Sequence, residues 1–193
     1  MPELRAVPGQ RRLRERFAAF RRDENGANAV EFALVAPIFI ALLVGIIQIF
    51  MVFFGQQLLQ QVVQQSARQI MTGQVQAAGM TSSQFSTLVC QQVRIIFNCS
   101  NLMISVQSGS SWSAMSAAAP TLTFNADGTV SNNWPYNPGG PSDKVVLEVI
   151  YQWPVFGGPL GFTLSNLPNG NRQITATAAF QNEPYQCPAC PCA

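Results

Sequence analysis

The chain has no histidine, and only 10% of its 193 residues are charged. Without histidine there is no Ser-His-Asp or Cys-His catalysis, no histidine general base and no histidine metal ligand. A typical soluble domain carries roughly 25% charged residues. The low charge and the apolar content of 48% argue against a disordered chain and favour a membrane or envelope protein. The net charge of +2 is too small to predict a nucleic-acid partner.

The few charges are concentrated near the N-terminus. Residues 1–26 hold seven arginines, and no charged residue lies between Glu31 and Arg68. Within this uncharged stretch lies an apolar run of 23 residues, Ala33–Gly55. Gln48 is its one strongly polar residue. About 20 apolar helical residues cross a hydrocarbon core of about 30 Å. Because arginines before a span stay in the cytoplasm, we expect a single-pass membrane protein with residues 56–193 outside.

Other interpretations of these segments remain open. A cleaved secretory signal has a shorter apolar run and an A-x-A-like site, neither of which is found here. A buried core helix would not explain the one-sided cluster of arginines. Within the leader, Leu13, Phe17 and Phe20 recur at helical spacing among the arginines. This pattern fits either a short amphipathic helix on the anionic inner leaflet or a plain topogenic leader.

One carboxylate, Glu31, lies at the start of the apolar stretch. A carboxylate is costly inside a bilayer, less so near the interface and at a helix N-terminus. Glu31 is therefore either an interfacial residue that snorkels towards water or a residue with a specific partner. The helix is expected to begin near Ala27, with Asn25 or Gly26 as its cap.

The residues around Glu31 resemble a known processing motif. Gly26 is followed by Ala27-Asn28-Ala29-Val30 and then by Glu31-Phe32. This arrangement is similar to the class IV prepilin site, in which cleavage follows a glycine and a glutamate stands fifth in the mature chain. The wider run GANAVEFALVAP, residues 26–37, resembles the opening of TadE-like proteins. These are pseudopilins or minor pilins of the tight-adherence, Flp-type IV pilus system.

The resemblance implies a partner for each of these residues. A prepilin peptidase of the inner membrane would cut between Gly26 and Ala27. Glu31, with the aromatic Phe32 after it, would pair with the N-terminus of a neighbouring pilin-like subunit during assembly, in contact with the pilus assembly platform. Such a pair in a low dielectric gives register more than raw stability. The outer part of the chain would then be periplasmic and the leader cytoplasmic, and the protein would either enter the pilus or remain in the membrane.

The helix is expected to continue beyond the membrane. After Gly55, apolar pairs recur about every four residues and glutamines occupy the other face, which predicts one helix from about 27 to 72. Pro37 predicts a kink, and Gly73 is a plausible stop. The apolar stripe serves either to dock the outer domain or to contact other pilin-like subunits. An alternative interpretation is that the glutamine repeats are low-complexity sequence, which the regular apolar spacing disfavours.

The remaining residues predict a small α+β domain. The pattern indicates a second helix over 81–97, strands over 101–108, 144–153 and 172–180, and a long irregular connection over 109–143 with short pieces such as 121–124. Loops between the strands favour a small antiparallel sheet of three or four strands, a pilin-like fold. We divide the chain into a leader (1–26), a long helix (27–73), a periplasmic domain (74–183) and a cysteine- and proline-rich tail (184–193).

All five cysteines fall in the outer part, which is expected to face an oxidising compartment. Cys90 and Cys99 flank the end of the second helix and can form a disulfide; the alternative is two buried free thiols. Cys187, Cys190 and Cys192 lie in a CPACPC tail. This tail is similar to a redox motif, but its prolines forbid the helix such a motif needs, and a structural zinc site needs a fourth ligand. A local or intermolecular disulfide fits best, and the odd count leaves one thiol free or paired between chains.

Three function classes remain. The first is a pilus-assembly protein without chemistry of its own, which needs no cofactor, metal, nucleic acid or small-molecule substrate. The second is a membrane-anchored enzyme, which without histidine would need two paired carboxylates, and none is evident among Asp127, Asp143, Glu148 and Glu183. The third is a signal-anchored envelope binding module, which would keep residues 1–26 attached.

Overall fold

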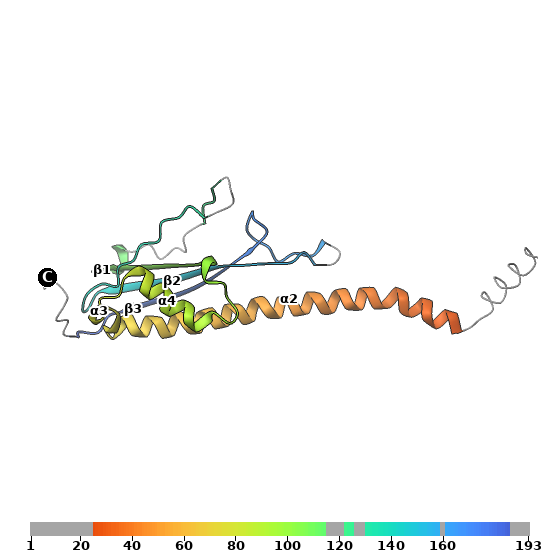
Figure 1. The fold of residues 1–193 in the computed structure, drawn as a ribbon, viewed down its shortest axis with the longest axis horizontal. Helices are drawn as coiled ribbons and strands as arrows, with labels where there is room; N and C mark the ends of the chain where they lie inside the picture. Colours follow the sequence, from red (N-terminus) through yellow and green to blue (C-terminus); the bar gives the residue numbers. More distant parts are fainter. Residues whose placement is uncertain (1–24, 115–121, 126–129, 159–160, 186–193) are drawn as a thin grey trace, which may run out of the picture. The chain divides into compact units, whose positions relative to one another are not determined.

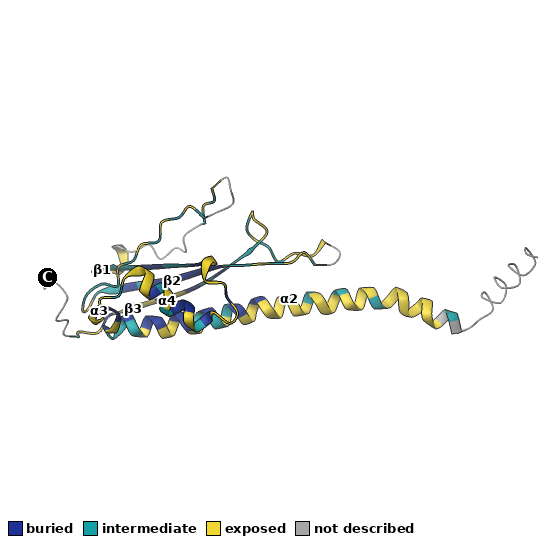
Figure 2. Ribbon diagram, in the orientation of Figure 1, coloured by how far each residue is buried: buried dark blue, intermediate teal, exposed yellow. Residues whose placement is uncertain are grey.

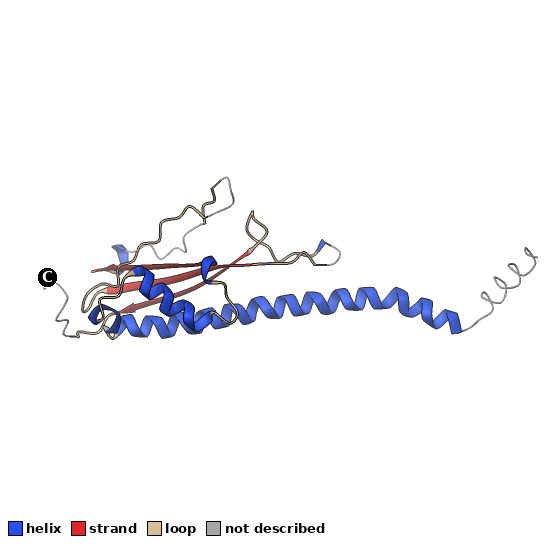
Figure 3. Ribbon diagram, in the orientation of Figure 1, coloured by secondary structure: helices blue, strands red, loops and turns tan. Residues whose placement is uncertain are grey.

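The computed structural model describes residues 25–114, 122–125, 130–158 and 161–185. The chain divides into two compact units, residues 1–47 with 158–161 and residues 48–157 with 162–193. Figure 1 traces the elements and Figure 3 separates helices from strands. Residues 1–24 of the predicted leader and the cysteines of the tail lie outside the described residues. Of the predicted piece 121–124, residue 121 lies outside them, and Phe124 forms an antiparallel bridge with Val130.

The long helix α2 extends over Asn25–Met71 and continues through Pro37. At 1.5 Å per residue, its 47 residues make an element about 70 Å long. The structure places Asn25 and Gly26 within the helix rather than at its cap, where the sequence analysis expected one of them. At the other end Gly73 has a φ of 77°, and a Cβ there would stand 2.7 Å from the Tyr185 ring. Gly73 therefore ends the helix because only glycine fits both the backbone conformation and the space.

Two further helices follow, α3 (Gln74–Ala77) and α4 (Ser82–Val93). Thr81 and Gln84 form a capping box at the start of α4, in which each side chain accepts from the other residue's backbone N–H. The predicted extension of α4 to residue 97 is wrong, because the chain turns after Val93. Phe97 leaves the helix and packs edge-on against Tyr151, with ring centroids 4.7 Å apart.

The sheet has three antiparallel strands in the order β1-β2-β3. They are β1 (Leu102–Gly109), β2 (Lys144–Trp153) and β3 (Arg172–Gln181). The mixed α+β fold with a small antiparallel sheet is therefore confirmed. The connection between β1 and β2 is more ordered at Tyr136 than predicted. Val106 of β1 exchanges two backbone hydrogen bonds with Pro135 and Asn137, each 2.8 Å long.

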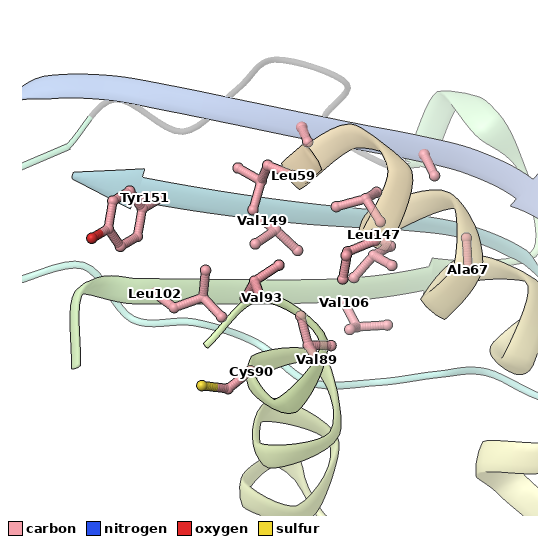
Figure 4. Close-up of a cluster of buried hydrophobic side chains, with 14 of the residues drawn as sticks. Leu59, Ala67, Val89, Cys90, Val93, Leu102, Val106, Leu147, Val149 and Tyr151 are labelled. Atoms are coloured by element: carbon pink, nitrogen blue, oxygen red, sulfur yellow. The ribbon is translucent and has the colours of Figure 1, made fainter. Parts of the chain in front are cut away.

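One face of the sheet forms the core against α4 and the second half of α2. Figure 4 shows Leu59 and Ala67 of α2, and Val89 and Val93 of α4, meeting Val106, Leu147 and Val149 of the sheet. Leu59, Val63, Ile70, Phe85 and Val89 are fully buried. Burying each such side chain stabilises the fold by about 1.5–3 kcal/mol. Part of the apolar stripe of α2 thus docks the outer domain, as one of the two sequence interpretations held.

The polar face of α2 has a structural task as well. Gln56 Nε2 donates to the Thr175 carbonyl at 2.7 Å, and Gln60 Nε2 donates to the Thr177 carbonyl at 3.3 Å. Gln56 and Gln60 are four helical residues apart, a rise of about 6.0 Å, and Thr175 and Thr177 are two strand residues apart, a rise of about 6.6–6.8 Å. Because these two spacings nearly match, successive glutamines can reach successive carbonyls on the same side of β3. The glutamines thereby satisfy carbonyls on the outer edge of β3, which argues against reading them as low-complexity sequence.

Candidate functional site at the start of α2

Gly26 and Ala27, the residues of the expected processing site, lie in the first turn of α2. A Cβ built at Gly26 would meet no atom within 4 Å, so packing does not demand a glycine at this position. Glycine costs a helix about 1 kcal/mol relative to alanine. The glycine therefore lowers the cost of opening this turn, and a protease needs an opened, extended peptide.

Glu31 and Phe32 follow on the surface of the same helix. Both side chains are exposed, Phe32 to 74%. Within the described part of the chain, no hydrogen bond or ion pair of Glu31 is found. Glu31 lies five residues after Gly26, or about 7.5 Å along the axis. Among the described residues, its carboxylate is therefore not engaged.

The apolar stretch after Glu31 is also uncovered. In Figure 2 the first half of α2 is predominantly exposed, including Leu34, Ile38, Ile46 and Phe50. Among the described residues, one helical segment, Asn28–Met71, is long and apolar enough to cross a membrane; its mean hydropathy reaches 2.7 with 11% of that window buried. An exposed apolar surface of this extent marks a site of contact with a membrane or with another protein, and a membrane anchor fits its length.

Small residues form a line on this helix. Ala29, Ala33, Pro37, Ala41 and Gly45 recur at every fourth position. An open groove runs along the helix beside Phe32, Pro37 and Ile40, among others. Small side chains at this spacing let a second helix approach closely inside a membrane.

Comparison with known families decides the assignment of this helix. Residues 26–68 match the family model of TadE-like proteins. This helix is similar to that of TadE-like proteins. No curated protein matches the chain, and no solved structure does.

The TadE-like segment coincides with the candidate site. It begins at Gly26, includes Ala27, Glu31 and Phe32, and ends at Arg68, within the last turn of α2. It covers less than half of the chain and none of the sheet. The resemblance given by residues 26–37 is thus confirmed, and the match extends beyond it along the helix.

The carboxylates that an enzyme would need are dispersed outside the TadE-like segment. Asp143 Oδ2 accepts from the Gly140 N–H at 2.7 Å and shapes the turn before β2. Glu183 is exposed, and its backbone N–H donates to the Met71 carbonyl. Asp127 lies outside the described residues. The described part of the chain contains no group of three or more cysteine or acidic residues that could hold a metal.

Glu148 is the unusual carboxylate. It lies in the middle of β2, paired in register with Ser105 of β1 and Thr177 of β3, and is only 5% exposed. Its Oε1 is buried without a hydrogen-bond partner. Burial raises the pKa of Glu148 to about 7, because the charged form loses water. The sequence analysis considered Glu148 only as one of four dispersed carboxylates and did not predict its burial.

The two cysteines near α4 are joined. Cys90, in the last turn of α4, and Cys99 form a disulfide with Cα atoms 5.7 Å apart. Cys90 is 8% exposed, whereas Cys99 is exposed. The bond fixes the turn between α4 and β1 that carries Phe97.

Sequence reasoning missed a contact of Gln48. Gln48 Nε2 donates to the Phe156 carbonyl, in the loop after β2, at 3.2 Å. The signal was present, since Gln48 is the one strongly polar residue in an apolar run, but its partner lies 108 positions away.

Proposed function

We propose that this protein is a minor pilin or pseudopilin that acts in the assembly of a tight-adherence type IV pilus. The observation that carries the proposal is the helix that matches the TadE-like family, which presents an exposed Glu31 five residues after Gly26 on an apolar surface. In this proposal the protein spans the inner membrane once, with its leader in the cytoplasm and residues 74–183 in the periplasm.

The first step is processing by a prepilin peptidase. Hydrolysis of the peptide bond between Gly26 and Ala27 releases the basic leader and leaves an α-amino group on Ala27. That amine has a pKa near 8 and is a cation at neutral pH. Glu31 then becomes the fifth residue, close to the positive end of the new helix, where the dipole favours its carboxylate.

The second step is association with other pilin-like subunits. The Glu31 carboxylate of an incoming subunit pairs with the Ala27 amine of its neighbour, since both charges are costly in lipid when unpaired. Phe32 and the groove beside Pro37 offer the adjacent apolar contact. The line of small residues from Ala29 to Gly45 allows close packing of the two helices. The ion pair sets the register of one helix along the other, and the apolar packing supplies most of the buried contact area.

The protein acts as a structural component and not as an enzyme in this proposal. Support comes from the roles of its outer carboxylates, of which Asp143 shapes a turn and Glu148 is enclosed in the sheet. The disulfide between Cys90 and Cys99 suits an oxidising periplasm.

The N-terminus of the native protein tests this function. The protein is isolated from cells with and without prepilin peptidase, and its mass and N-terminal sequence are determined. A chain that begins at Ala27 only when the peptidase is present supports the proposal. A chain that keeps residues 1–26 in both cells makes it a signal-anchored envelope binding module instead.

A further inference from the structure

Residues 154–157, which follow β2, are apolar and lie close to the expected membrane span. Residues 154–162 read PVFGGPLGF, and no charged residue occurs between Glu148 and Arg172. Phe156 is 78% exposed and Phe162 is 41% exposed. Two exposed phenylalanines in an uncharged loop are costly in water, so this surface calls for a partner.

The hydrogen bond from Gln48 to Phe156 fixes the depth of this loop along α2. Trp153, the last residue of β2, lies against Gly55 at the outer end of the apolar stretch. Three residues later the Phe156 carbonyl accepts from Gln48. Gln48 precedes Gly55 by seven residues, or about 10 Å along the helix. From Trp153 to Phe156 the chain therefore runs alongside the apolar stretch and not away from it.

We infer that Phe156, with the neighbouring residues 154–157, lies in the outer leaflet of the membrane, so that the domain contacts lipid at a second place besides α2. This inference rests on the proposed span of α2. The apolar stretch of the helix continues at the level of Phe156, which identifies lipid as the occupant of the exposed surface.

The contact explains why a glutamine stands inside the apolar stretch. Backbone carbonyls that leave water need a hydrogen-bond donor, and a loop cannot supply its own as a helix does. Gln48 supplies one to Phe156. A leucine at position 48 would suit lipid better but would leave this carbonyl without a donor.

Neighbouring residues agree with a lipid boundary at this end of the domain. The turn between α4 and β1 exposes Ile95 to 93% and Ile96 to 37%. The same turn carries Phe97, whose ring lies 5.7 Å from that of Trp153. Tryptophan is enriched at membrane interfaces, where its ring is half in lipid. Arg94, exposed beside Ile95, suits the anionic headgroups of the same boundary.

Depth-dependent fluorescence tests the inference on the full chain. Cys187, Cys190 and Cys192 are replaced by serine, which leaves the Cys90–Cys99 disulfide in place. Single cysteines are introduced by Phe156→Cys, Ile46→Cys and Gln181→Cys and labelled with the environment-sensitive dye NBD. Each variant is reconstituted into vesicles of phosphatidylethanolamine and phosphatidylglycerol, with or without lipids that carry a doxyl quencher on the acyl chain.

We expect blue-shifted emission and several-fold quenching at positions 46 and 156. Position 181 should stay unquenched, because Gln181 pairs with Lys144 at the opposite end of the sheet from Trp153. Quenching at 46 without quenching at 156 overturns the inference and leaves the span intact. Absence of quenching at 46 overturns the span and the inference together. A blue shift at 156 that appears only at high protein density, without lipid quenching, assigns the surface to a second copy of the chain and also overturns the inference.

Discussion

The ring of Trp153 lies directly on the backbone of Gly55, so that a Cβ at position 55 would stand 2.7 Å from Cζ3 of the indole. This contact joins the end of β2 to the middle of α2. It leaves room for glycine alone, because the atoms above it belong to a rigid ring that also packs against Phe97.

Replacing this glycine should weaken the fold. We expect Gly55→Ala to destabilise the protein by about 1–3 kcal/mol, since overpacking forces the helix and β2 apart. Gly45→Ala is the matched control, because a Cβ at Gly45 meets nothing within 4 Å. Thermal unfolding in detergent, followed by near-ultraviolet circular dichroism, measures both. Equal melting temperatures for the two variants would contradict the contact.

Glu148 should make stability depend on pH. Its pKa rises from 4.5 in the unfolded chain to about 7 in the fold, so the folded state holds a proton that the unfolded state releases. The melting temperature should therefore be highest below pH 4.5 as far as this group is concerned, and fall as the pH rises towards 7. Glu148→Gln should remove this decline and be the more stable protein at pH 8. Glu183→Gln, at an exposed carboxylate, is the control and should leave the decline in place.

The glutamines that bond to β3 should contribute measurably. Gln56→Leu removes the donor to the Thr175 carbonyl and should cost about 0.5–1.5 kcal/mol. Gln57→Leu lies one residue along on an exposed position and should cost less. Denaturant unfolding of both variants in the same detergent gives the difference. A Gln57 variant as unstable as the Gln56 variant would mean that loss of surface polarity, not the hydrogen bond, is responsible.

The disulfide should stabilise the outer domain. A bond between Cys90 and Cys99 closes a short loop, and Cys90→Ala with Cys99→Ala should lower stability by about 2–3 kcal/mol. The triple serine variant of the tail cysteines serves as the control. Alkylation without reductant, followed by mass spectrometry, should leave Cys90 and Cys99 unmodified in the native protein. Modification of both would show that the bond does not form.

Glu31 should matter for assembly and not for insertion. Glu31→Ala should leave the amount of protein in the membrane fraction unchanged, because it only removes a charge from an apolar helix. Pili on the cell surface should be greatly reduced, since the Ala27 amine of the neighbour loses its partner. Glu183→Ala controls for the loss of an exposed carboxylate elsewhere. Normal piliation in the Glu31 variant would remove the pairing from the proposed function.

The spacing of apolar residues predicted the helices and strands that keep the same side buried from end to end. The β-branched run from Lys144 to Trp153 gave the bounds of β2, and the four-residue spacing of apolar pairs after Gly55 gave the course of α2. The end of α4 was not predictable in the same way. Ile95 and Ile96 continue the apolar pattern of the helix, but the disulfide and the packing of Phe97 on Tyr151 return the chain to β1.

Contacts between residues far apart in the chain could not be predicted from local pattern. The partners of Gln48, Gln56 and Gln60 lie more than 100 positions away. The sequence showed only that Gln48 interrupts an apolar run and that Gln56 and Gln60 lie on the polar face of a helix. The candidate site at Gly26 and Glu31 could be found from sequence because its residues are close neighbours with a recognisable spacing.

Both outer strands of the sheet have backbone groups already engaged. Gln56 and Gln60 take carbonyls on the free side of β3, and the segment around Tyr136 takes both backbone groups of Val106 on the free side of β1. A strand from another molecule would have to displace these bonds before it could add to the sheet. Copies of this domain can therefore be crowded together without pairing strand to strand at these bonded positions.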